Sequence, residues 1–267
     1  MEENSLSRAV TDEDKKKSSG NIQLASRGVK MQVRGVRITR KGNLDSDKIA
    51  SAQLDGLERL PDTAAEIRSI AGVLHADAKG DIFLGKDFSQ QRLQTMNLSD
   101  RKVIAFATHA LVPGDLDGLD QPALALSSPS ITGDKGDGLL TTDEILKMKL
   151  NADWVVLSAC NTGAAEGQGA EAVSGLGKAF FYAGTRALLV SMWSVETTSA
   201  RKLVTGTFRA QEENKSLSRA QALRKSMLDL IDKETLKDEA TGKIVAGYAH
   251  PLFWAPFVIV GDPGKSL

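Results

Sequence analysis

Two side chains that can do covalent chemistry follow two apolar runs of the sequence. His109 follows VIAFAT, residues 103–108, and Cys160, the only cysteine of the chain, follows WVVLSA, residues 154–159. An imidazole can take the proton of a thiol, whose ordinary pKa of about 8.5 leaves it mostly neutral at pH 7. The pair predicts nucleophilic catalysis, with Cys160 as the nucleophile and His109 as the general acid–base. Taken singly, each residue is more typical of a packed strand end.

The segments around these residues predict the fold that brings them together. Continuous apolar runs predict buried strands, and amphipathic stretches between them predict helices. The strands are expected at 103–108, 154–159, 187–192 and 253–260, and the helices at 60–75, 174–183, 197–212 and 216–233. Such alternation predicts an α/β fold with a parallel sheet covered on both faces. Ligands of open α/β sheets bind at the carboxyl ends of the strands, where His109 and Cys160 both lie.

Two spacings are typical of a capping box at a helix N-terminus. Thr63 precedes Glu66 by three residues, and Thr141 precedes Glu144 by three residues. In this motif the hydroxyl accepts a hydrogen bond from the backbone N–H of the glutamate, whose carboxylate accepts one in return. The sequence therefore predicts that helices begin at both places.

Composition limits the classes of partner. The 267 residues include 34 basic and 34 acidic ones, so no net field favours nucleic acid or acidic lipid. A single cysteine cannot form an intramolecular disulfide, and the sequence shows neither a signal peptide nor a membrane-spanning run. We expect a cytoplasmic protein that binds neither membrane nor nucleic acid.

The chain is expected to divide into three parts. Residues 1–20 are polar and predict a disordered tail, and residues 56–267 form the α/β domain. The extension between them, residues 21–55, is basic and alternates in a way that predicts an edge strand or a hairpin. A nucleic-acid patch is the alternative there, but no aromatic residues interleave with the basic ones to stack on bases.

No metal or organic cofactor is expected. His75 and His250 have no cysteine or histidine partners at the spacing of a zinc site. A G-x-G-x-x-A spacing at residues 167–172 fits a dinucleotide fingerprint, but that motif should follow its strand directly. Here six residues intervene between Cys160 and Gly167.

The sequence resembles the CHAT domain family of caspase-like (clan CD) cysteine peptidases from about Gly56 to Asp262. The matching blocks, in chain order, are LPDTAAEI, VIAFATHALV, ALALSS, DGLLTTDEILKMKLNADWVVLSACNTG, GLGKAFFYAGTRALLVSMWSVE and HPLFWAPFVIVGD. The resemblance implies a caspase-like three-layer α/β/α fold with a mostly parallel central sheet. It also implies a His109–Cys160 dyad that cleaves a specific protein or peptide substrate through a thioester.

Other site residues are assigned by their position relative to the dyad. The backbone N–H groups of Ala110 and Cys160 are expected to stabilise the oxyanion. Caspase-like enzymes usually have glycine where this chain has Ala110. In similar folds the loop after the strand that follows the nucleophile helps form the pocket for the substrate residue before the scissile bond. The resemblance therefore implies this role for the segment Trp193, Ser194, Val195 and Glu196. For Glu196 two interpretations stay open, pairing with a basic side chain or a favourable charge at a helix N-terminus.

Two readings of the function remain. In the first, the chain is a cysteine endopeptidase regulated by a partner such as a tetratricopeptide-repeat chain, since the sequence has no such repeat of its own. In the second, the caspase-like fold is a catalytically silent scaffold or signalling module. Small misplacements of the two reacting groups decide between these readings.

Overall fold

The structure, a computed structural model, describes residues 21–24, 29–32, 54–158, 168–193, 195–237 and 241–264. Within the basic extension, β1 (Asn21–Leu24) and β2 (Val29–Gln32) pair as an antiparallel hairpin. The tail expected at residues 1–20 lies outside the described residues. The domain boundaries drawn from the sequence therefore stay predictions.

The central sheet has four strands. They are β3 (Val103–Phe106), β7 (Trp154–Leu157), β8 (Ala187–Ser191) and β11 (Phe257–Gly261), in the spatial order β11-β8-β7-β3. The pairs β3–β7 and β7–β8 are parallel, and β11 runs antiparallel to β8. The expectation of a mostly parallel sheet is confirmed.

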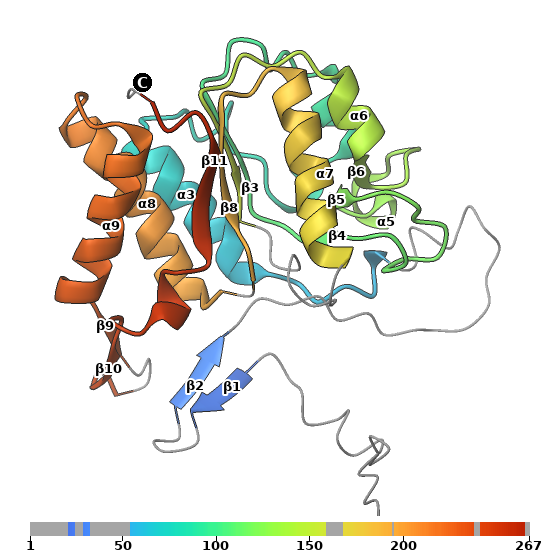
Figure 1. The fold of residues 1–267 in the computed structure, drawn as a ribbon. Helices are drawn as coiled ribbons and strands as arrows, with labels where there is room; N and C mark the ends of the chain where they lie inside the picture. The colour runs from blue at the N-terminus through green and yellow to red at the C-terminus, as the bar shows by residue number, and fades with distance from the viewer. Residues whose placement is uncertain are drawn as a thin grey trace, which may run out of the picture.

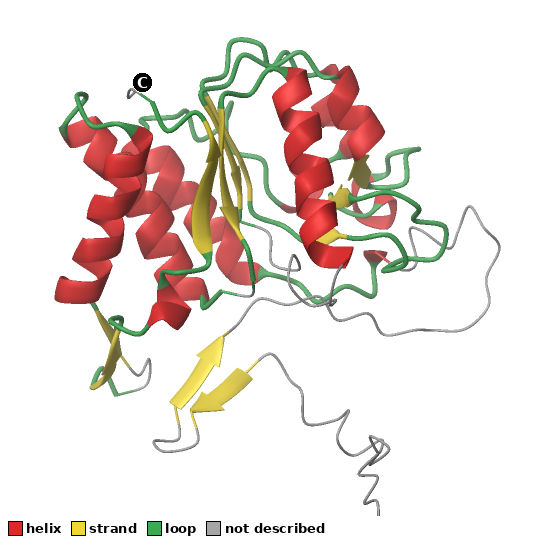
Figure 2. Cartoon of the chain, viewed as in Figure 1, coloured by secondary structure: helices red, strands yellow, loops and turns green. Residues whose placement is uncertain are grey.

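Helices cover both faces of this sheet (Figures 1 and 2). One face carries α3 (Pro61–Val73), α8 (Thr197–Glu213) and α9 (Arg219–Lys233). The other carries α6 (Thr142–Lys147) and α7 (Gln168–Ala183). The three layers confirm the α/β/α fold expected from the sequence.

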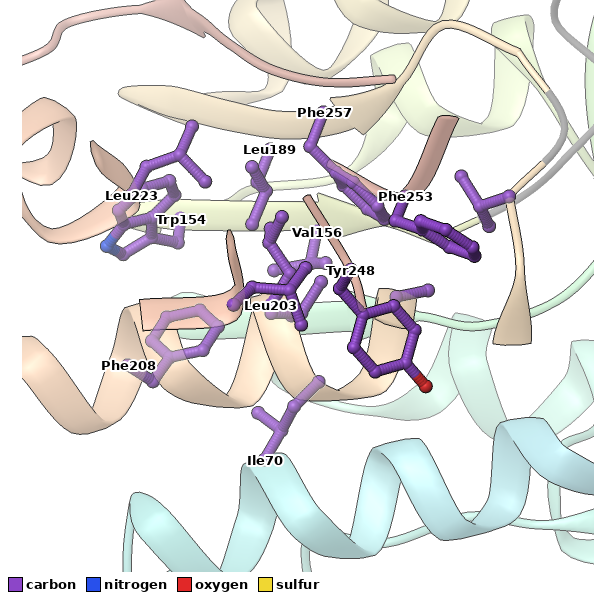
Figure 3. Close-up of a cluster of buried hydrophobic side chains, with 14 of the residues drawn as sticks. Ile70, Trp154, Val156, Leu189, Leu203, Phe208, Leu223, Tyr248, Phe253 and Phe257 are labelled. Atoms are coloured by element: carbon purple, nitrogen blue, oxygen red, sulfur yellow. The ribbon is translucent and has the colours of Figure 1, made fainter. Parts of the chain in front are cut away.

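Apart from Ser191 and Gly261, the last residues of β8 and β11, the strands of the central sheet are apolar, because each face of the sheet meets a helical layer. Trp154 and Val156 pack on the side of α8, whereas Val155 and Leu157 pack on the side of α7. All four side chains are at most 5% exposed. Figure 3 shows the first cluster, in which strand residues meet Leu203 and other side chains of α8 and α9. Successive strand residues point to opposite faces, so burial on both faces removes any polar alternation.

A small antiparallel sheet lies beside the carboxyl end of β3. Its strands are β4 (Ala110–Leu111), β5 (Ala123–Ala125) and β6 (Leu139–Thr141), in that order. Because β4 begins one residue after His109, this sheet fixes the backbone on the C-terminal side of the histidine.

The remaining elements connect the layers. They are η1 (Gly85–Asp87), α4 (Gln90–Thr95), α5 (Pro129–Thr132), β9 (Thr235–Lys237), β10 (Ile244–Gly247) and η2 (Pro251–Phe253). No helix in the described ranges combines the length and the apolar character that crossing a bilayer requires.

One of the two predicted capping boxes forms. The Thr141 side chain accepts a hydrogen bond from the Glu144 N–H, and the Glu144 carboxylate accepts one from the Thr141 N–H. The Thr63–Glu66 prediction is wrong, because Pro61 begins that helix and places Thr63 inside its first turn. The Thr63 hydroxyl instead donates to the Leu60 carbonyl at 2.6 Å.

Candidate active site

His109 lies in the turn between β3 and β4, three residues past the last residue of β3. Its side chain is buried, with 6% of its surface exposed. The ring Nε2 atom lies 2.7 Å from the backbone carbonyl oxygen of Glu58. The main chain is held as well, because the Ala125 N–H donates to the His109 carbonyl at 2.9 Å. Both the ring and the backbone of His109 are therefore fixed by main-chain groups.

The contact with Glu58 assigns the protons of the imidazole. A carbonyl oxygen can only accept, so Nε2 carries the hydrogen and donates it. In the neutral ring the lone pair then resides on Nδ1, which can accept a proton. Burial lowers the pKa of His109 below its ordinary value of 6.5, and the hydrogen bond to Glu58 opposes this shift more weakly. The ring is thus held in the form that a general base needs at pH 7.

The sheet register aligns the strand residues that precede three of the predicted site positions. Phe106 of β3 lies opposite Leu157 of β7, and Leu157 lies opposite Val190 of β8. His109, Cys160 and Trp193 each follow this row by three residues along the chain. The three strands are parallel, so all three positions follow the same edge of the sheet.

Cys160 itself lies outside the described residues. The chain is described up to Ser158, which is buried and whose N–H donates to the Phe106 carbonyl at 2.9 Å. That bond continues the pairing of β7 with β3 one residue beyond Leu157. Ser158, two residues before Cys160 in the sequence, therefore lies beside the end of β3, the strand that precedes His109.

The N–H of Ala110 is directed away from the neighbouring strand β5. Ala110 lies opposite Leu124, and the adjacent pair, His109 and Ala125, is hydrogen bonded. Bonded and non-bonded pairs alternate along an antiparallel ladder, so Ala110 occupies a non-bonded position. The alanine that replaces the usual glycine leaves this N–H in place.

The segment after β8 divides into an exposed part and a buried part. Trp193 is 42% exposed, whereas Val195 is fully buried. The Glu196 carboxylate is buried and accepts hydrogen bonds from the N–H groups of Thr198 and Ser199, at 2.9 and 2.7 Å. The helix-terminus interpretation of Glu196 is confirmed, since it is the N-cap of α8. Ser194 lies outside the described residues.

The sequence matches the CHAT domain family over residues 7–262. The chain belongs to this family. CHAT domains are caspase-like and related to the clan CD cysteine peptidases. The match begins at residue 7, so it includes the whole basic extension at residues 21–55 and part of the expected tail. No curated protein matches the sequence significantly.

One backbone group at the candidate active site was not predicted from the sequence. The Glu58 carbonyl orients His109, yet it is a backbone atom that every residue type carries. No sequence pattern identifies this carbonyl, because its contact with His109 depends on where the segment before α3 lies in the folded chain. In the described ranges, no three His, Cys, Asp or Glu side chains lie close enough together to hold a metal ion.

Proposed function

We propose that this CHAT domain is a cysteine endopeptidase in which Cys160 is the nucleophile and His109 the general acid–base. One observation carries the proposal. Phe106, Leu157 and Val190 form one row across three parallel strands, and both reacting residues follow that row by three positions. Adjacent strands lie about 4.8 Å apart, so this register favours a short distance between the two side chains.

The state of His109 supports its role as the base. The Nε2–H donates to Glu58, so the Nδ1 lone pair is the one available to a thiol. Because burial lowers the pKa of the imidazole, the ring is neutral at pH 7 and can accept the thiol proton. A buried ring hydrogen-bonded at one nitrogen also keeps its orientation during the reaction.

The reaction follows from these roles. The Cys160 sulfur attacks the carbonyl carbon of the scissile peptide bond while its proton passes to His109. His109 then gives that proton to the leaving amine as the C–N bond breaks, which leaves a thioester on Cys160. Water attacks the thioester, with His109 accepting its proton, and the carboxylic acid product leaves as the thiol forms again.

Backbone groups stabilise the tetrahedral intermediates. The Ala110 N–H, directed away from β5, is one donor to the oxyanion, and the Cys160 N–H is the second. Such preorganised donors commonly contribute the largest electrostatic part of acyl-transfer catalysis. No cofactor is needed for these steps.

The substrate is a protein or peptide whose chain lies along the edge that carries Trp193. The exposed indole of Trp193 offers an apolar contact for the substrate. Val195 and Glu196 are buried and fix the backbone of the same segment. Recognition of a specific substrate is regulated by a partner, of which a tetratricopeptide-repeat chain is one candidate.

The second candidate function is a silent scaffold or signalling module. The observation that favours it is the burial of His109, of whose surface only 6% is exposed. A ring buried to this extent is also consistent with a structural role, in which its hydrogen bond to the Glu58 carbonyl stabilises the fold.

A covalent probe separates the two functions. Acyloxymethyl-ketone peptides of varied sequence should label the native chain, and neither Cys160→Ala nor His109→Ala should react. His75→Asn is the matched histidine control, because His75 is exposed and has a positive φ of 54°, which asparagine tolerates. It should be labelled like the native chain. Absence of labelling across the peptide set, alone and with candidate partners, would favour the scaffold.

A further inference from the structure

The three parallel strands of the central sheet begin at the edge opposite to the one where His109 lies. Lys102, Asp153 and Arg186 each precede the first residue of one of these strands. The Asp153 N–H donates to the Lys102 carbonyl at 2.8 Å, and the Arg186 N–H donates to the Ala152 carbonyl at 2.9 Å. These residues therefore form one row along the amino edge of the sheet, remote from His109.

Helices α6 and α7 lie side by side on one face of the sheet, and their C-terminal ends meet at this edge (Figure 1). The N–H of Leu150, three residues past α6, donates to the carbonyl of Ala183, the last residue of α7, at 2.7 Å. Gly184 permits this contact, because a Cβ atom there would lie 2.2 Å from the Leu150 carbonyl oxygen. Lys149 and Tyr182, each one residue from this bond, belong to neighbouring stretches of backbone.

The surface at these helix ends combines two exposed apolar side chains with exposed cations. Tyr182 is 82% exposed and Leu146 is 45% exposed. Lys178 lies one turn before Tyr182 on α7 and is exposed, and so are Lys147 and Lys149 at the end of α6. We call these five residues the α6–α7 patch. Within the ranges that the structure describes, none of its three lysines forms an ion pair.

The carboxylates at the amino edge do not neutralise the patch. Asp153 pairs with Arg186 and, at 3.5 Å, with Arg219. Asp262 pairs with Arg219 at 3.5 Å. The two arginines thus balance the two aspartates, and the acidic residues of α6 lie in its first turn, at the other end of the helix. The three lysines therefore leave the patch with a net positive charge.

We propose that the α6–α7 patch binds an acidic segment of a partner protein. An apolar side chain of that segment covers Tyr182 and Leu146, and its carboxylates face the three lysines. Exposed apolar side chains bordered by polar ones are typical of protein interaction surfaces, and tyrosine is enriched in them. The surrounding charges select an acidic partner and raise its association rate. The proposal does not depend on peptidase activity, because the patch lies at the opposite edge from His109.

A nucleic acid fits the patch less well than an acidic protein segment. Its backbone presents phosphates and sugars, which offer no apolar group to cover the aliphatic side chain of Leu146. Three lysines also neutralise few phosphates, and the chain as a whole has no net charge to add attraction at longer range.

Fluorescence anisotropy of labelled peptides mixed with the full chain tests the proposal. The probes are short peptides in which glutamate is combined with leucine or phenylalanine in varied order, and we expect Kd values of about 1–100 µM. Tyr182→Ala removes the main apolar contact, and the double variant Lys149→Glu/Lys178→Glu reverses the charge. Each should weaken binding about tenfold or more. All three side chains are exposed, so Tm should change little.

Lys237→Glu is the matched control variant. Lys237 is an exposed lysine of β9, which belongs to a different sheet, so this variant should bind the peptides like the native chain. Peptides with glutamine in place of every glutamate should bind about tenfold more weakly than the acidic ones. Binding of no peptide up to about 1 mM overturns the proposal, and so does unchanged binding by the folded double variant. Equal affinity for the glutamine peptides overturns the role of charge, and tighter binding of a single-stranded DNA oligonucleotide than of any peptide assigns the patch to nucleic acid instead.

Discussion

The Nε2 atom of His109 lies 2.7 Å from the carbonyl oxygen of Glu58, a residue 51 positions earlier in the chain. This contact joins the segment that leads into α3 to the carboxyl end of β3. It satisfies a ring nitrogen that has little access to water, and it leaves Nδ1 as the basic atom of the neutral ring. One backbone carbonyl therefore sets both the orientation and the tautomer of the proposed base.

Replacing His109 with glutamine should separate its catalytic role from its structural role. A glutamine amide can donate to the Glu58 carbonyl but cannot act as a base at neutral pH. We expect His109→Gln to keep most of the stability of the native chain and to lose covalent labelling and peptide cleavage. His109→Ala should lose activity too, and about 0.5–3 kcal/mol of the free energy of unfolding, because it removes a buried ring together with its hydrogen bond to Glu58.

Urea unfolding and peptide cleavage measure the two effects on the same protein samples. The prediction fails in its catalytic part if His109→Gln cleaves peptides at a rate near that of the native chain. It fails in its structural part if the alanine variant is as stable as the glutamine variant.

The stability of the native chain should fall as the pH is lowered below about 6.5, the ordinary pKa of histidine. Burial holds the pKa of His109 below that value in the folded state. Between the folded and the unfolded pKa, the unfolded chain binds more protons, so acidification favours unfolding. One proton can change the free energy of unfolding by at most about 1.4 kcal/mol for each pH unit.

The contribution of His109 to this pH dependence is found by comparing the native chain with His109→Gln from pH 7.5 to pH 5. Other groups titrate in both proteins and cancel in the difference. We expect the native chain to lose stability relative to His109→Gln as the pH falls. A difference that stays constant over this range, or that changes in the opposite direction, contradicts a lowered pKa.

Glu196 should matter more for stability than for substrate choice. Its carboxylate accepts two backbone hydrogen bonds at the start of α8 and is only 4% exposed. Loss of an N-cap typically costs about 0.5–2 kcal/mol, so Glu196→Ala should lower the free energy of unfolding by that amount. Ser218→Ala, which removes the N-cap of α9, should have a similar effect and serves as the control.

Peptide-library profiling tests the other part of that prediction. Glu196→Gln keeps oxygen and removes charge, so it should leave the preferred residue before the scissile bond unchanged. A loss of preference for basic residues in this variant would assign Glu196 to substrate recognition instead.

The fold was largely predictable because its signals are local and repeated. Runs such as WVVLSA and ALLVSM are apolar on both faces of a strand, a pattern that indicates a strand buried between two helical layers. Both runs form strands of the parallel part of the central sheet. The Thr141 capping box also depends on residues three apart and forms as expected. The Thr63 box fails because Pro61, already suited to the first helical position, starts the helix earlier.

The site was predictable only where side-chain chemistry marks it. His109 stands out as a titratable residue after an apolar run, and the register places it where the sequence indicated. The Glu58 carbonyl and the outward N–H of Ala110 have no residue signature, because both are backbone groups positioned by tertiary contacts. For Glu196 the sequence left two roles open, since a carboxylate before a helix serves either as a cap or as a ligand.

Trp193 should act on substrate binding with little effect on folding. Its side chain is 42% exposed and follows the same row of strand residues as His109 and Cys160, so it is placed to contact a bound peptide. Trp193→Ala should raise the KM for peptide cleavage about tenfold, equivalent to about 1.4 kcal/mol, and change Tm little. Tyr182→Ala, which removes a more exposed aromatic ring from α7, should leave both quantities unchanged. Steady-state kinetics on one good peptide substrate measures the difference. An unchanged KM with a large loss of Tm would mean that Trp193 supports the segment after β8 and does not contact the substrate.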